Sequence, residues 1–176
     1  LKFNSIIDLM KNSSSLFPDH TAFTNLNTRL SYKKIDRYSE KFGAYLQNQL
    51  SITKRSKVAI MLPNLLTYPV ALFGSYLAGA IVININPLFK GREIESALND
   101  SGAETIIVLD RFVSELEPVV KNTLIKNIIV CRVTDLLSPI MAVLIKTVFF
   151  LKGPKISLNS NYLLFFLMLI HNHHIY

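Results

Sequence analysis

The chain has 176 residues, of which half are apolar, and its formal net charge is +7 at neutral pH. A chain of this length can bury roughly 68–70% of its unfolded surface, so it is long enough for one domain with a real core. Its single cysteine, Cys131, excludes an internal disulfide framework and a cysteine-rich zinc module, and it fits a reducing compartment. No basic segment leads into an apolar stretch at the start, so the sequence predicts no secretory signal.

The charge is distributed unevenly along the chain. Residues 1–138 carry a net charge of +4 and residues 139–176 carry +3, because no Asp or Glu follows Asp135. In the second region 23 of 38 residues are apolar. The sequence therefore predicts an ordinary globular region over 1–138 and an apolar, acid-free tail over 139–176.

A cationic group in the first region has helical spacing. Lys33, Arg37 and Lys41 recur every four residues and would share one helix face. This pattern favours either an ordinary solvated surface or an anion-binding face, and the nearby Asp36 and Glu40 favour the first. No aromatic RNA-binding motif, zinc finger or basic zipper accompanies the group, so we expect no nucleic-acid partner.

The first predicted elements are a short helix and a hairpin. An amphipathic helix begins after Asn4, a good N-cap residue, and is expected to end in the Asn-Ser-Ser-Ser run at 12–15. Short strands separated by a turn are predicted at 21–24 and 28–30.

A longer helix and the first buried strand follow. Apolar residues recur every three to four positions from Tyr32, which predicts a helix of about twenty residues with Ser31 as its N-cap. The continuous apolar run at 58–62 predicts a strand that is covered on both faces. The next helix is predicted over 65–78, with Pro69 in its first turn.

Strands and helices alternate in the rest of the first region. The patterns predict strands at 81–83, 105–109 and 127–130 and helices at 91–100 and 112–120. Buried strands that alternate with amphipathic helices form right-handed crossovers. The predicted fold class is therefore α/β, with a mainly parallel sheet and helices on both faces.

No recognisable site stands at the ends of these strands. Phosphate sites in parallel sheets are built from glycine-rich turns that lead into helices, and the segments at 63–64, 84–87 and 110–111 contain no glycine. Cys131 lies in an apolar strand, which is typical of a core thiol. The residues alone therefore predict no catalytic, cofactor-binding or metal-binding side chain.

One histidine cluster remains as a metal candidate. His171, His173 and His174 could bind a metal weakly, but no carboxylate lies near them in the sequence. We interpret this cluster as an unstructured end and expect no metal site.

Four segments resemble the AMP-forming, adenylating ligases, the group that includes acyl-CoA synthetases and luciferase. LSYKKI at 30–35 and LAGAIVININP at 77–87 resemble the first two conserved cores of this superfamily. The segments at 61–74 and 98–103 resemble the bacterial long-chain fatty acid–CoA ligases in particular. Two departures are small: Lys34 replaces a common acidic residue, and Gly91 replaces a common proline.

The resemblance implies a fold, a reaction and a set of substrates. It implies part of the large N-terminal domain of these ligases, which activate a fatty acid with ATP and Mg²⁺ and then transfer it to coenzyme A. The ATP loop, the magnesium-binding glutamate and the catalytic lysine of the family lie beyond the region that resembles it. No catalytic residue can therefore be carried over, and we expect the isolated chain to be inactive.

Two other functions stay open at this point. The chain could be a non-catalytic scaffold or membrane-associating remnant, or part of another acid–CoA or adenylating ligase. For the intact enzyme the resemblance implies a cytoplasmic location with contact at the inner face of the cytoplasmic membrane. The sequence does not predict the preferred acyl chain or the oligomeric state. A homodimer is one option for the intact enzyme.

The tail departs from the family after Ser138 and has three interpretations. A shifted reading frame or truncated gene explains the loss of acidic residues and of family likeness. The alternatives are an interfacial membrane helix and a native structured extension. The apolar run at 162–170 spans only about 14 Å as a helix, which is too short to cross a bilayer core of roughly 30 Å.

Overall fold

The computed structural model describes residues 3–152 and 162–170. The strands are β1 (Thr21–Asn25), β2 (Thr28–Ser31), β3 (Lys57–Met61), β4 (Ile81–Asn84), β5 (Thr105–Leu109), β6 (Asn127–Cys131) and β7 (Leu163–Leu164). The helices are α1 (Ile6–Leu16), α2 (Tyr32–Leu50), α3 (Thr67–Leu77), α4 (Gly91–Ser101), α5 (Val113–Val120), α6 (Pro139–Lys152) and α7 (Phe165–Ile170).

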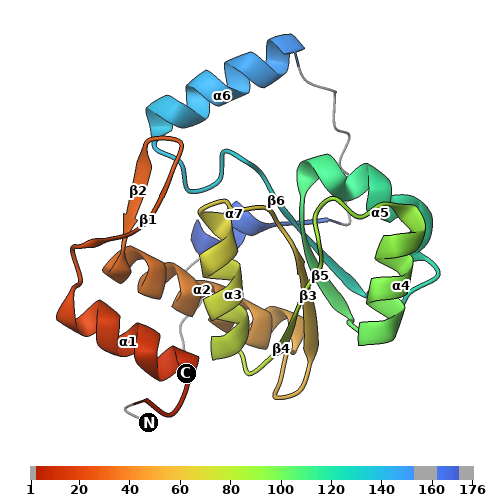
Figure 1. Cartoon of the computed structure of the whole chain (residues 1–176), viewed down its shortest axis with the longest axis horizontal. Coiled ribbons are helices and arrows are strands. Elements are labelled where there is room, and N and C mark those ends of the chain that lie inside the picture. Colours follow the sequence, from red (N-terminus) through yellow and green to blue (C-terminus); the bar gives the residue numbers. More distant parts are fainter. Residues whose placement is uncertain (1–2, 153–161, 171–176) are drawn as a thin grey trace.

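A five-stranded parallel sheet forms the centre of the fold (Figure 1). Its order is β4-β3-β5-β6-β7, and every neighbouring pair is parallel. One apolar core joins α2, α3 and α7 to one face of the sheet, and a second joins α4 and α5 to the other. The predicted fold class is confirmed, because each apolar strand is covered by helices that the crossovers place on both faces.

The predicted hairpin and long helix are also confirmed. Strands β1 and β2 pair antiparallel, and the turn between them places Leu26 and Asn27 at positive φ. Ser31 caps α2, since its hydroxyl oxygen accepts a hydrogen bond from the Lys34 backbone N–H at 3.4 Å.

The expected limits of the first helix are wrong at both ends. Its N-cap is Ser5 rather than Asn4, and the helix continues through the serine run to Leu16. Serines interrupt helices when their hydroxyls compete for backbone groups. Here the Ser13 hydroxyl donates to a carbonyl one turn earlier, at 2.9 Å, and that of Ser14 donates to the first carbonyl of α2, at 3.1 Å. Both hydroxyls are therefore satisfied without breaking the helix.

Two glycines allow α2 and α3 to approach closely. A Cβ atom on Gly74 would lie 2.7 Å from Phe42 Cδ1 and 3.0 Å from the Ser39 carbonyl oxygen. A Cβ atom on Gly43 would lie 2.9 Å from the Gly74 carbonyl oxygen. The two helices are therefore packed at a distance that side chains at these positions would not permit.

The tail contributes to the core, which the sequence did not predict. Strand β7 extends the sheet beside β6, and α7 buries Phe165, Met168 and Leu169. The ring of Phe165 lies 4.8 Å from that of Phe42, between centroids. Lys41 Nζ donates to the Leu169 carbonyl at 3.0 Å, so this cation of the predicted basic face is engaged within the fold. The three interpretations of the tail stay predictions.

Some features of the tail lie outside the described residues. These include the histidine cluster at 171–174 and the Gly-Pro pair at 153–154. Within the described part of the chain, no helix has both the length and the apolar character needed to cross a membrane.

The close packing of α2 on α3 leads to a first prediction. Alanine is the better helix former by about 1 kcal/mol, but overpacking a filled interface costs about 1–3 kcal/mol. Because one atom that the added Cβ would meet is the Ser39 backbone carbonyl oxygen, which cannot move aside as a side chain can, we expect a cost of about 2–3 kcal/mol here. We expect Gly74→Ala to lower the free energy of unfolding by about 1–2 kcal/mol, as measured by urea denaturation. Ser96→Ala, on the exposed side of α4, is the control and should change it by less than about 0.5 kcal/mol. A Gly74→Ala protein as stable as the parent would contradict this packing.

Candidate functional site

The carboxyl ends of the parallel strands carry most of the candidate polar groups. Ligands of open α/β sheets usually bind at this edge. Asn64 follows β3, Asn84 ends β4, and Asp110 follows β5. The Tyr68 hydroxyl donates to Asn84 Oδ1 at 3.1 Å, which fixes that amide at the edge strand.

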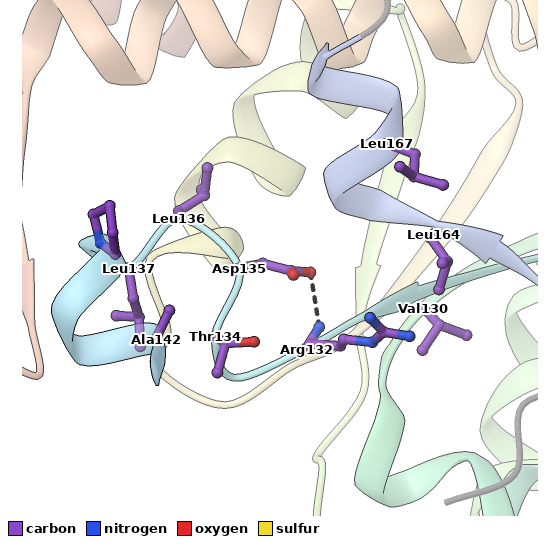
Figure 2. A pocket seen from close by; sticks show the side chains of 10 residues that line it. Val130, Arg132, Thr134, Asp135, Leu136, Leu137, Ala142, Leu164 and Leu167 are labelled. Atoms are coloured by element: carbon purple, nitrogen blue, oxygen red, sulfur yellow. Dashed lines mark hydrogen bonds between the residues drawn. The ribbon is translucent and has the colours of Figure 1, made fainter. Parts of the chain in front are cut away.

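A cavity of about 270 Å³ lies at the end of β6. Figure 2 shows Leu164 and Leu167 on one side of it and Leu136, Leu137 and Ala142 on the other. Its polar lining comes from the loop that joins β6 to α6, namely Arg132, Thr134 and Asp135. The remaining lining residues are Val130 and Pro139. The cavity is therefore mainly apolar and is bounded by segments that are far apart in the sequence.

Local hydrogen bonds set the shape of this loop. Asp135 Oδ2 accepts from the Arg132 backbone N–H at 2.8 Å, as the dashed line in Figure 2 shows. Leu136 adopts a φ of 63°, a conformation that costs a residue with a Cβ free energy. The Ser138 N–H donates to Thr28 Oγ1 at 3.0 Å, which ties the end of the loop to the hairpin.

Asp110 is the unusual carboxylate of this edge. Its Oδ1 atom is buried and has no hydrogen-bond partner among the described residues. Burial raises the pKa of the Asp110 carboxyl, while the Arg111 backbone N–H and the positive charges of Arg132 and Arg111 act in the opposite direction. The fold therefore disfavours the ionised form of Asp110.

Cys131, at the end of β6, is a core thiol, as the sequence predicted. It is fully buried, and burial raises the pKa of its thiol well above the usual value. The carboxylates of Asp135 and Asp110 raise this pKa further, and only the neighbouring Thr67 hydroxyl opposes the shift. The thiol is thus protonated at neutral pH and is a poor nucleophile.

The described loops at this edge lack the glycine-rich turn that holds phosphates in many nucleotide sites. The edge carries both acidic side chains, Asp110 and Asp135, and basic ones, Arg111 and Arg132. Among the residues that the structure describes, no group of three His, Cys, Asp or Glu side chains could hold a metal ion. The arrangement can position an apolar group in the cavity, but it supplies no activated nucleophile.

The sequence did not point to the cavity. The polar residues directly after β6 were the only available signal, because its other wall comes from β7 and α7, which have no clear periodicity. That no residue of this chain is catalytic or binds a cofactor remains a prediction.

Comparisons with known proteins give a consistent result. The model of the AMP-binding enzyme family matches residues 10–146. The chain is 42% identical over 147 residues to a long-chain-fatty-acid–CoA ligase of Escherichia coli O157:H7, covering 84% of this chain and 26% of that protein. It is 44% identical over 137 residues to the corresponding ligase of Haemophilus influenzae, covering 78% and 24%.

A solved structure shows the same fold. The anthranilate CoA ligase AuaEII in complex with anthranoyl-AMP superposes with a TM-score of 0.75 at 20% identity, covering 95% of this chain and 28% of that one. The chain thus spans about a quarter of the length of the relatives that it matches. The family match continues past residue 138 into α6, and the expected division at residue 138 stays a prediction.

The raised pKa of Asp110 leads to a second prediction. Because the folded state binds this proton more tightly than the unfolded state does, the protein loses stability as the pH rises through the raised pKa. We expect Asp110→Asn to be more stable than the parent at pH 7, with the advantage shrinking as the pH falls to 4. Chemical denaturation at several pH values measures this difference.

Asp19→Asn, at an exposed turn, is the matched control and should change stability little at either pH. An Asp110→Asn protein whose stability differs from the parent by the same amount at both pH values would contradict the account.

Proposed function

Because this chain belongs to the AMP-binding enzyme family, we propose that it forms the first part of a ligase that joins long-chain fatty acids to coenzyme A. The main support for this proposal is the 42% sequence identity to a long-chain-fatty-acid–CoA ligase over 84% of this chain. The α/β architecture agrees with it, since a CoA ligase of known structure has the same fold.

The proposed reaction has two steps and three substrates. A fatty acid carboxylate attacks the α-phosphorus of ATP, which forms the acyl–adenylate bond and releases pyrophosphate. The thiol of coenzyme A then attacks the acyl carbon, releasing AMP and the thiol proton. A requirement for Mg²⁺ belongs to the same proposal and concerns the intact enzyme.

The role proposed for this chain is structural. The carboxyl edge of its sheet has two carboxylates and no glycine-rich turn, so the groups that hold ATP would come from the rest of the enzyme. The parallel sheet and its two helical layers would support those groups. The chain by itself is then expected to be inactive.

Two alternatives receive less support. A ligase for another acid shares the fold, but the anthranilate enzyme is only 20% identical to this chain, against 42% for the long-chain enzyme. A non-catalytic remnant agrees with the lack of a phosphate site, but it does not explain why the tail completes the core. We place the intact enzyme in the cytoplasm, at the inner face of the membrane, and propose no oligomeric state.

A chimera tests the proposed function. Residues 10–146 of this chain would replace the matching segment of the Escherichia coli O157:H7 relative. We expect the chimera to form acyl-CoA from oleate or palmitate at a rate within about tenfold of the parent ligase, because the segment supplies the same scaffold. The readout is ATP–pyrophosphate exchange together with acyl-CoA formation.

The parent ligase without this segment is the control and should be inactive. A chimera that folds, as judged by circular dichroism and gel filtration, but has no activity would contradict the proposed function. Clear turnover by the 176-residue chain alone would contradict its structural role.

A further inference from the structure

The cavity at the end of β6 carries charges of both signs on a mainly apolar wall. Arg132 and Asp135 supply the charges, and Thr134 is the only other polar side chain that lines the cavity among the described residues. On the side of the tail the wall is formed by Leu164 and Leu167. A few polar groups on an apolar wall are typical of a small-molecule site, and the reaction proposed for the intact enzyme gives these groups no task.

The acidic group is held inside the wall. Asp135 is only 9% exposed, and its Oδ2 atom accepts from the Arg132 backbone N–H at 2.8 Å, which fixes the carboxylate in the loop. Figure 2 shows this carboxylate facing the space between the loop and Leu167. An ionised carboxylate has about four acceptor positions, so this group can also accept hydrogen bonds from a ligand.

The basic group is open to solvent. The Arg132 side chain is exposed, and Figure 2 shows its guanidinium group beside Val130 and Leu164. A guanidinium group presents a planar fork of N–H donors that matches the two oxygens of a carboxylate. Arg132 can therefore bind a carboxylate that enters the cavity from solvent.

The volume of the cavity limits the size of the ligand. It is about 270 Å³, which equals the volume of about nine water molecules. An engineered apolar cavity of about 150 Å³ holds benzene. The ligand that fills this cavity therefore has about nine to twelve non-hydrogen atoms. A long acyl chain is too large to be enclosed, and a bare ion would leave the leucine wall in contact with water.

The two charges favour a ligand that carries both signs. A ligand with only an ammonium group would approach the like charge of Arg132, and one with only a carboxylate would approach that of Asp135. An α-amino acid has both groups on one carbon atom. Its ammonium group can donate to Asp135 while its carboxylate accepts from Arg132, and an apolar side chain would cover the leucine wall.

We propose that this cavity binds a free apolar α-amino acid of the size of leucine or phenylalanine. The ammonium group binds Asp135, the carboxylate binds Arg132, and the side chain packs against Leu164 and Leu167. The ligand thus bridges the β6–α6 loop and the tail, and its binding stabilises the folded arrangement of both by mass action. The proposal goes beyond the proposed function and does not depend on it, because it concerns only groups of this chain.

Isothermal titration calorimetry of the full 176-residue chain tests the proposal. We expect L-phenylalanine to bind one site per chain with a Kd below about 1 mM at pH 7. 3-Phenylpropionate lacks the ammonium group and phenethylamine lacks the carboxylate, so we expect each to bind at least about tenfold more weakly. A 3-phenylpropionate affinity equal to that of L-phenylalanine would assign the cavity to a simple carboxylate and overturn the proposal.

Two variants test the role of each charge. Arg132→Gln keeps the backbone N–H that binds Asp135, and we expect it to weaken L-phenylalanine binding at least about tenfold without weakening that of phenethylamine. Asp135→Asn keeps an oxygen acceptor for the same N–H, and we expect an equal loss for L-phenylalanine without a loss for 3-phenylpropionate. Arg92→Gln, on the exposed side of α4, is the matched control and should bind as the parent does.

The outcomes decide for or against the site. Circular dichroism shows whether each variant folds. If Asp135→Asn does not fold, Arg132→Gln still decides, because the Arg132 side chain is exposed. The absence of saturable heat with both L-phenylalanine and L-leucine, unchanged binding by Arg132→Gln, or an equal loss in Arg92→Gln overturns the proposal.

Discussion

The close approach of α2 to α3 is the constraint on which the rest of the structure depends. Phe42 packs against the bare backbone of Gly74 on one side and against the Phe165 ring on the other. This single buried side chain therefore links α2 to α3 and to α7. Close-packed interiors transmit such constraints, because a filled space cannot absorb an added methyl group without moving its neighbours.

Much of this arrangement could be predicted from the sequence. The apolar runs at 58–62 and 105–109 predict buried central strands. The recurrence of apolar residues every three to four positions from Tyr32 predicts α2, because a helix that is buried on one face needs apolar side chains at that spacing. Strand β7 could not be predicted, since two residues carry no periodicity and their pairing depends on a distant strand. The continuation of α1 through its serines depended in part on a hydrogen bond to α2, which local propensity does not contain.

The candidate site shows the same division. Asp110 and Arg132 could be located from the sequence, because they directly follow buried strands whose carboxyl ends share one edge. The cavity beside them could not be located from the sequence. Two of its lining residues, Leu164 and Leu167, belong to β7 and α7, whose pairing with the sheet the sequence does not predict. At this edge the pKa values of the Cys131 thiol and the Asp110 carboxyl are both raised, and no loop after the described strands is glycine-rich, which agrees with the proposed structural role.

The central claim is that this chain supplies the scaffold of an AMP-binding ligase while its nucleotide-binding groups come from elsewhere. Isothermal titration calorimetry of the 176-residue chain with ATP and Mg²⁺ tests this claim most directly. The account predicts no saturable heat up to a nucleotide concentration of about 1 mM, a limit that corresponds to roughly 4 kcal/mol of binding free energy. Saturable binding of one ATP per chain at micromolar concentration would contradict it.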